Sequence, residues 1–150
     1  MSRPIRIAAR AIIVRKGAVL LVNAFPGTTE LWCAPGGGGV AGEGLTETLV
    51  REVREETGLT IAPGALAGVS EFHNPEDGFH QVDIFFHAKT SGDIPAHWTD
   101  PEGIVVERRW ATAAELATLD HKPDHLAEMA FRGVLARYNA LHLMSPKQRT

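Results

Sequence analysis

Alternating apolar positions predict most of the secondary structure of this chain. Five segments rich in β-branched or alternating apolar residues predict β-strands. They are residues 6–14, 18–22, 61–71, 81–88 and 105–111. Lys16 and Gly17 separate the first two segments and supply a turn, so these two strands are expected to form a hairpin.

Helical spacing predicts helices at residues 45–57, 112–119 and 124–143. The first segment contains no Gly or Pro, and Gly58 follows it where a helix ends in a left-handed residue. Thr112 is a good first residue for the second helix. The third is the longest and carries apolar residues at helical spacing. Strands and helices mix without a regular βαβ order, so the sequence predicts an α+β fold or a mixed α/β sandwich.

Length and charge limit the classes of protein to which the chain can belong. It has 150 residues, 44% apolar residues and a formal net charge of −3. We therefore expect one domain over residues 1–150, with a loose polar tail at 145–150. No long basic block is present, which argues against nucleic acid or a membrane surface as partner.

Cys33 is the only cysteine, so the chain has no internal disulfide and no cysteine cluster for a metal. The N-terminal apolar run is short and interrupted by Arg10, unlike a secretory signal or a membrane span. These features predict a cytoplasmic location.

The helix predicted at 45–57 carries a crowded group of acids. Glu52, Glu55 and Glu56 lie within five positions, although like charges at this spacing repel by about 0.2–0.5 kcal/mol per pair. On a helical projection Glu56 falls in the apolar stripe with Leu49 and Val53, so it faces the protein body. One interpretation is a solvated acidic face. The other is a site for Mg²⁺ or Mn²⁺, which bind carboxylate oxygens and remove the repulsion.

Four consecutive glycines, Gly36 to Gly39, precede this helix. They could form a plain flexible loop. Because glycine lets the backbone approach a ligand closely, they could instead wrap a metal–phosphate centre. The run matches neither a P-loop nor a dinucleotide fingerprint, and its place before the acidic helix favours the metal–phosphate interpretation.

The combined pattern resembles the Nudix hydrolase family. The family signature is G, five residues, E, seven residues and R-E-U-x-E-E-x-G-U, in which U is aliphatic. Every specified position is filled in residues 37–59, which makes the match specific. The matching residues are Gly37, Glu43, Arg51, Glu52, Val53, Glu55, Glu56, Gly58 and Leu59.

The resemblance implies an α/β/α sandwich around a mixed sheet, and a role for each residue of the signature. Glu52 and Glu56 would bind a divalent metal, with the Gly37 carbonyl as a further ligand. Glu55 would bind a second metal or orient water. Arg51 would belong to the catalytic set and, with Glu43, hold the glutamates in position, as residues behind metal ligands commonly do. The cofactor would be Mg²⁺ or Mn²⁺.

Residues outside the signature are weaker candidates. Glu102 and Glu107 lie in or beside a long polar loop, and either could complete the metal site or act as general base. Glu107 is favoured, and Glu55 is a third candidate for the base. The predicted substrate-binding residues are Arg10, Trp32, Gly36 and Gly38. Arg10 could also lie at a strand edge, and Trp32 could stack on a base or fill the core.

The predicted function is metal-dependent hydrolysis of a nucleoside diphosphate linked to another group, by attack of water on phosphorus. Nucleoside triphosphates and ADP-ribose-like compounds remain open as substrates, and a homodimer remains open as the assembly. The alternative is a catalytically silent Nudix-fold domain that binds a nucleotide as sensor or scaffold. Retention of all the signature glutamates favours the enzyme.

Overall fold

The computed structural model describes residues 3–23, 31–133 and 137–143. Within these residues the strands form a 9-stranded sheet. The strands are β1 (Arg6–Arg15), β2 (Ala18–Val22), β3 (Trp32–Cys33), β4 (Gly36–Gly38), β5 (Ala62–Asn74), β6 (Phe79–Lys89), β7 (Arg108–Thr112), β8 (His121–Lys122) and β9 (Arg137–Leu143). The helices are α1 (Leu45–Thr57), α2 (Ala113–Leu116) and α3 (Leu126–Phe131).

Strand β1 is the centre of the sheet. It pairs in parallel with β6 along one edge, and its other edge pairs with β4 at Ala8–Arg10 and with β2 at Val14–Arg15. The sheet order is β8-β3-β2-β1-β6-β5-β9, with β4 and β7 branching from β1 and β2. The division of β1 between two partners brings the glycine strand β4 alongside α1.

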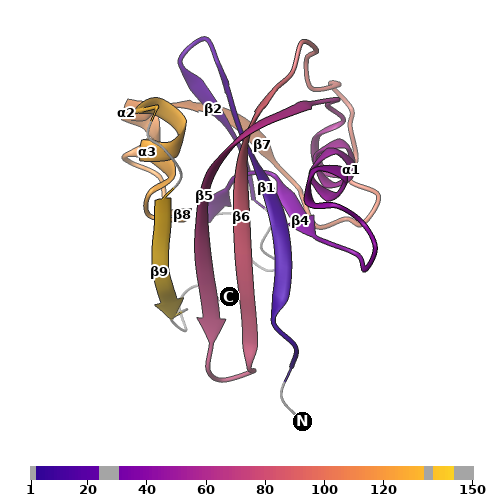
Figure 1. The fold of residues 1–150 in the computed structure, drawn as a ribbon. Coiled ribbons are helices and arrows are strands. Elements are labelled where there is room, and N and C mark those ends of the chain that lie inside the picture. The colour runs from indigo at the N-terminus through magenta and orange to yellow at the C-terminus, as the bar shows by residue number, and fades with distance from the viewer. Residues whose placement is uncertain (1–2, 24–30, 134–136, 144–150) are drawn as a thin grey trace.

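Helices cover both faces of this sheet, with α1 on one side and α2 and α3 on the other (Figure 1). Successive strand residues point to opposite faces, and Ile12 and Ile13 accordingly belong to different apolar clusters. Ile12 packs in the cluster of α2 and α3, whereas Ile13 packs in that of α1 with Leu49 and Val53. The predicted α+β sandwich with a mixed sheet is thereby confirmed.

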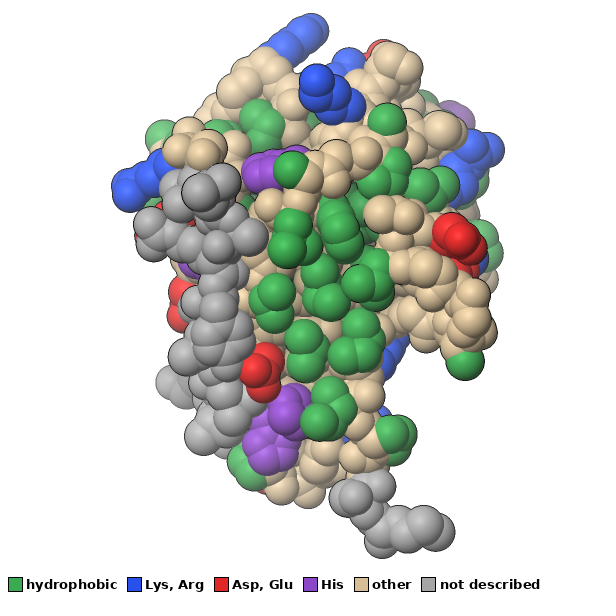
Figure 2. Space-filling view, in the orientation of Figure 1, with side chains coloured by type: hydrophobic (Ala, Val, Ile, Leu, Met, Phe, Trp, Pro, Cys, Tyr) green, Lys and Arg blue, Asp and Glu red, His purple; other side chains and the backbone are tan. Residues whose placement is uncertain are grey.

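Part of the sheet face that carries α1 is exposed to solvent. Ile7 and Leu66 are 42% and 46% exposed on β1 and β5. In Figure 2 hydrophobic side chains gather over the middle of the sheet in view. In the described ranges we find no helix of the length and apolarity needed to span a lipid bilayer.

Local signals placed several elements correctly. The helix predicted at 45–57 is α1, and it ends at Gly58 in the left-handed conformation with φ 76°. The hairpin of β1 and β2 is also confirmed. The helix predicted at 112–119 is shorter, and a reciprocal capping box between Thr112 and Glu115 begins it.

The predicted helix at 124–143 is wrong. The chain forms α3 and then the strand β9, which pairs in parallel with β5. Gly133, with φ 57°, lies just after α3 in a conformation that does not continue a right-handed helix. Residues 137–140 alternate polar and apolar and therefore also fit a strand. The predicted loose tail at 145–150 lies outside the described residues.

Candidate metal and diphosphate site

Helix α1 turns its acidic face toward the sheet. The side chains of Glu52 and Glu56 are buried, and their residues are only 8% and 6% exposed. Glu55 is half-buried, whereas Glu47 and Arg54 are exposed. This is the orientation predicted from the helical projection, and it excludes a solvated acidic face for Glu52 and Glu56.

The glycine run forms the strand β4 rather than a loop, and its packing requires glycine. A Cβ atom on Gly36 would lie 2.1 Å from the Ala9 carbonyl oxygen, in a backbone with φ 150°. A Cβ atom on Gly37 would lie 2.5 Å from Glu52 Oε2. The predicted close approach of backbone to the acidic helix is therefore present, and it is achieved by strand pairing with β1.

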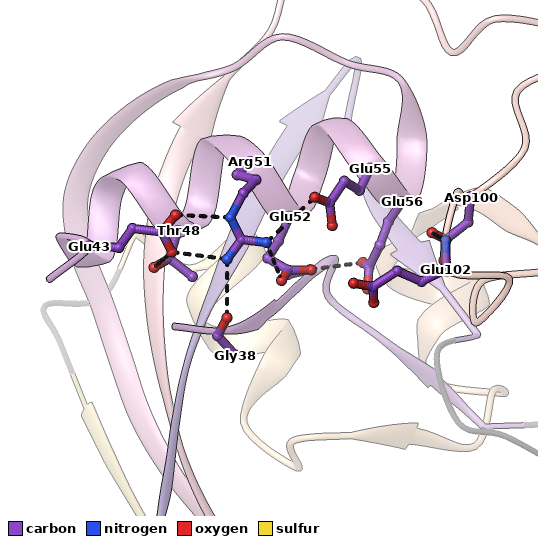
Figure 3. Close-up of polar contacts among 10 residues, drawn as sticks. Gly38, Glu43, Thr48, Arg51, Glu52, Glu55, Glu56, Asp100 and Glu102 are labelled. Carbon is purple, nitrogen blue, oxygen red and sulfur yellow. Dashed lines mark hydrogen bonds and ion pairs between the residues drawn. The ribbon is translucent and has the colours of Figure 1, made fainter. Parts of the chain in front are cut away.

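Arg51 holds the acidic face together (Figure 3). Its Nε and Nη2 atoms donate to the two carboxylate oxygens of Glu43, both at 2.9 Å. Its Nη1 donates to Glu52 Oε1 at 2.8 Å and lies 3.5 Å from Glu55 Oε1. Hydrogen bonds from Arg51 and Thr48 lower the pKa of Glu43 to about 2, so Glu43 remains ionised and keeps Arg51 in place.

Glu56 is the most deeply placed acid of the group. Its Oε2 accepts a hydrogen bond of 2.9 Å from the Gly36 amide. Burial raises its pKa to about 8 despite the opposing charge of Arg10 and the Gly36 hydrogen bond, and Glu52 and Asp100 raise it further. Burial also raises the pKa of Glu52. Without a counter-charge, this site therefore resists full ionisation.

The donors in this cluster fit a hard divalent cation. Every candidate ligand is an oxygen atom, and Glu55 Oε2 is buried without a hydrogen-bond partner in the part of the chain described. As the side chains stand, no three His, Cys, Asp or Glu residues in the described ranges are arranged as a complete metal site. Glu52 is turned to Arg51 and Glu56 to the Gly36 amide, so binding a cation requires these carboxylates to reorient.

The loop before β7 adds two acids to this site that lie far away in the sequence (Figure 3). The buried carboxylate of Asp100 accepts hydrogen bonds from the amides of Glu102, Ile104 and Val105 at 2.9, 3.1 and 2.9 Å. Burial is the main cause of the raised pKa of Glu52; Arg51 opposes it, and the charges of Glu55 and Glu102 add to it. Sequence reasoning did not single out Asp100, although the turn-forming segment Asp100–Gly103 was a usable signal.

Glu107, the favoured loop acid, has an exposed side chain just before β7. Its amide donates to Asn23 Oδ1 at 2.7 Å, and its carbonyl accepts from the Asn23 amide at 3.3 Å. These contacts fix the backbone of Glu107. The Glu102 side chain is exposed as well, and it lies beside Glu56 at the end of α1 (Figure 3).

Two predicted substrate-binding residues have structural partners. Arg10 donates to Asp83 Oδ1 at 2.9 Å and to the Ala34 carbonyl at 3.0 Å. Trp32 is 7% exposed and lies in the apolar core, with Arg109 5.5 Å from its ring centroid. Their roles in binding a substrate stay predictions.

Sequence reasoning did not consider Arg6. This exposed residue lies over Gly38, where a Cβ atom would be 2.6 Å from the Arg6 Nε atom. A guanidinium at this end of β4 is well suited to meet a phosphate group. The strand register that places Arg6 there is not apparent from local sequence.

The fold and the glutamate site together define the class of this protein. The NUDIX domain model matches residues 4–130, so the chain belongs to the Nudix family. The family resemblance drawn from the signature is confirmed.

Three known proteins illustrate this membership. A putative 8-oxo-dGTP diphosphatase of Bacillus subtilis is 35% identical over 86 residues, which are 57% of this chain and 53% of that protein. A putative ADP-ribose pyrophosphatase of the same species is 33% identical over 79 residues, 51% of this chain and 37% of that protein. The MutT protein of Bacillus halodurans is 25% identical and superposes with a TM-score of 0.70, covering 95% of this chain and 92% of that one. The matches thus span only about half or less of the two curated relatives.

Proposed function

We propose that this protein is a divalent-metal-dependent pyrophosphohydrolase acting on a nucleoside diphosphate linked to another group. The observation that carries the proposal is the inward-facing pair Glu52 and Glu56, 8% and 6% exposed beside the glycine strand. Ionised carboxylates buried this deeply are costly unless a cation neutralises them. A diphosphate needs the same positive charge when its bridging bond breaks.

The residues of α1 and β4 would have different roles in binding and positioning the cation. Glu52, Glu56 and the backbone at Gly37 would hold Mg²⁺ or Mn²⁺, and Arg51 with Glu43 would keep Glu52 in position. A cation bound there supplies positive charge for the phosphate oxygens and makes a bound water more acidic. Glu55 has a free buried oxygen with which to hold a second cation or orient that water.

The general base and the phosphate contacts come from other elements in this proposal. Glu102 rather than Glu107 would take the proton from water, which is supported by its position beside Glu56 at the end of α1 (Figure 3). Arg6, lying over Gly38, would meet a phosphate group of the substrate. Arg10 would act indirectly, because its hydrogen bond to Asp83 on β6 holds β1 against β6.

The substrate class is supported by the relatives rather than by a pocket. Their names include an 8-oxo-dGTP diphosphatase and an ADP-ribose pyrophosphatase, which represent the two substrate classes left open by the sequence. A small nucleoside diphosphate derivative is the proposed partner. The cytoplasmic location and a homodimer stay predictions.

The test is a panel of nucleoside triphosphates and nucleoside diphosphate derivatives, incubated with Mg²⁺ or Mn²⁺ and analysed by mass spectrometry. Hydrolysis of at least one compound that stops in EDTA and returns with metal supports the proposal. Absence of turnover with both metals would favour the silent nucleotide-binding domain instead.

Running the productive reaction in ¹⁸O-labelled water then locates the attack. We expect the label in a phosphate-containing product, because a cation at the glutamate site would stabilise the charge that develops on phosphate oxygens when water attacks phosphorus. Label in a sugar hydroxyl would contradict attack on phosphorus.

A further inference from the structure

We propose that Trp98 and Gly58 form a latch that positions Glu102 at the glutamate site. This latch joins the end of α1 to the loop at residues 90–107. The inference rests on the proposed function, because it assigns a part in the reaction to Glu102. It adds a positioning role for two residues that do not themselves touch the glutamate carboxylates.

Trp98 fits the C-terminal end of α1 closely. Its Nε1–H donates to the main-chain carbonyl of Glu55 at 2.8 Å. Helix carbonyls in the last turn have no partner within the helix, so this bond satisfies a group that would otherwise need water. The Arg54 guanidinium lies 5.8 Å from the Trp98 ring centroid, which adds a cation–π contact.

Gly58 makes room for the indole. A Cβ atom at this position would lie 2.7 Å from Trp98 Cδ2 and 2.9 Å from Pro95 Cδ. Its φ of 76° also favours glycine. The glycine of the family signature therefore has two functions here: it ends the helix, and it lets the loop pack directly against that end.

A turn held by hydrogen bonds to Asp100 connects Trp98 to Glu102. Asp100, 4% exposed, accepts three backbone amides of the segment that follows it, including that of Glu102. The Gly103 amide also donates to the Asp100 carbonyl at 2.9 Å. The backbone of Glu102 is thus fixed to Asp100, only two residues from the indole that is bonded to α1.

The chemical consequence concerns Glu55 and Glu102. The latch binds the backbone of Glu55, so it fixes the end of α1 and the loop acid relative to each other. Figure 3 places Asp100 and Glu102 at this end of the helix, beside Glu56. Loss of the latch would therefore move Glu102 away from the reacting water without removing a carboxylate.

A double-mutant cycle tests this coupling. Trp98→Phe keeps a ring over Gly58 but removes the Nε1–H donor. We expect it to lower kcat about 10-fold with little change in KM, as when an interaction that serves the transition state is lost. In a Glu102→Gln background the same substitution should change kcat less than about 2-fold, because the residue it positions is already inactive.

Trp110→Phe is the matched control. Trp110 is another half-buried tryptophan, on β7, with Arg15 5.6 Å from its ring centroid. Arg15 donates to the Gly92 carbonyl at the start of the same loop, so this variant disturbs the loop without removing the Trp98 bond to α1. It should keep kcat near the wild-type value even if its stability falls. Equal losses of kcat in the two tryptophan variants would overturn the latch, as would a Trp98→Phe effect of the same size with and without Glu102→Gln.

Hydrogen exchange in the metal-free protein gives a readout independent of activity. Peptides covering Glu102, Ile104 and Val105 should exchange faster in Trp98→Phe than in Trp110→Phe, because the Asp100 turn loses its anchor. Unchanged protection in Trp98→Phe would contradict the latch whatever the protein hydrolyses. Wild-type turnover separately tests the proposed function.

Discussion

The Gly36 amide donates a 2.9 Å hydrogen bond to Glu56 Oε2, which joins the first glycine of β4 to the last glutamate of α1. The bond explains how a carboxylate that is 6% exposed is accommodated without a cation. It does not fully offset burial, since the pKa of Glu56 is raised to about 8. In the metal-free protein Glu56 is therefore protonated below about pH 8, and the proposed cation would favour its ionised form.

This raised pKa predicts the pH dependence of stability in the metal-free protein. Glu56 takes up its proton at about pH 8 when folded, against an ordinary value of 4.5. Between these values the folded state binds more protons than the unfolded state, so the Glu56 contribution to stability falls as pH rises. Chemical unfolding in EDTA at about pH 5.5 and about pH 8.5 should show a steeper fall for wild type than for Glu56→Gln. Equal slopes would contradict the buried, proton-binding Glu56.

Added metal should stabilise the folded protein, and its effect should increase with pH. A cation binds the ionised carboxylates, so saturating Mg²⁺ should raise the melting temperature more at about pH 8.5 than at about pH 5.5. Glu47→Gln, on the exposed side of α1, should leave this increase nearly unchanged. Loss of the increase in Glu47→Gln would mean that the cation binds on the other side of the helix.

Gly37→Ala tests the contact between β4 and the metal site. The new Cβ would lie 2.5 Å from Glu52 Oε2, so this carboxylate must move from its place. We expect turnover to fall about 10-fold or more, the usual scale when a group that positions a metal ligand is disturbed. Gly39→Ala is the matched control, because its nearest contact would be an ordinary 3.4 Å to Thr48 Oγ1. Similar turnover in the two variants would argue against Glu52 as a ligand.

Arg51→Lys tests the support behind the glutamates. Lysine carries the charge but cannot bond Glu43 through two nitrogens while also reaching Glu52. Turnover should fall about 10–100-fold, with weaker Mg²⁺ affinity in calorimetric titration. Arg3→Lys, at an exposed surface ion pair of 3.7 Å with Asp77, should change neither quantity. A near-wild-type Arg51→Lys would remove the positioning role of Arg51.

The glutamate site was predictable from sequence because its signals are local. Helix periodicity alone places Glu52 and Glu56 on the buried side of α1, and Gly58 marks the helix end. The positions of Arg6 and Arg10 were not predictable, since they depend on the register of β1 against β4 and β6. Strand register across a sheet is set by long-range packing rather than by neighbouring residues.

The long helix predicted at 124–143 failed for a different reason. Residues 137–140 satisfy a strand pattern as well as a helical one, and the parallel pairing of β9 with β5 decides between them. The contact of Trp98 with Gly58 could not be predicted from the sequence either, because it joins a polar loop to a helix end far away in the chain. Only the capping behaviour of Gly58 has a local signature.

The central claim is that Glu52 and Glu56 hold a divalent cation that is required for hydrolysis of a diphosphate. The most direct measurement compares Mg²⁺-dependent turnover of Glu56→Gln and Glu47→Gln on the best substrate of the panel, with circular dichroism to confirm that both are folded. Glutamine keeps the shape of Glu56 but removes its charge, so turnover should fall by about two orders of magnitude or more, whereas Glu47→Gln should stay close to wild type. Near-wild-type turnover of folded Glu56→Gln would contradict the account.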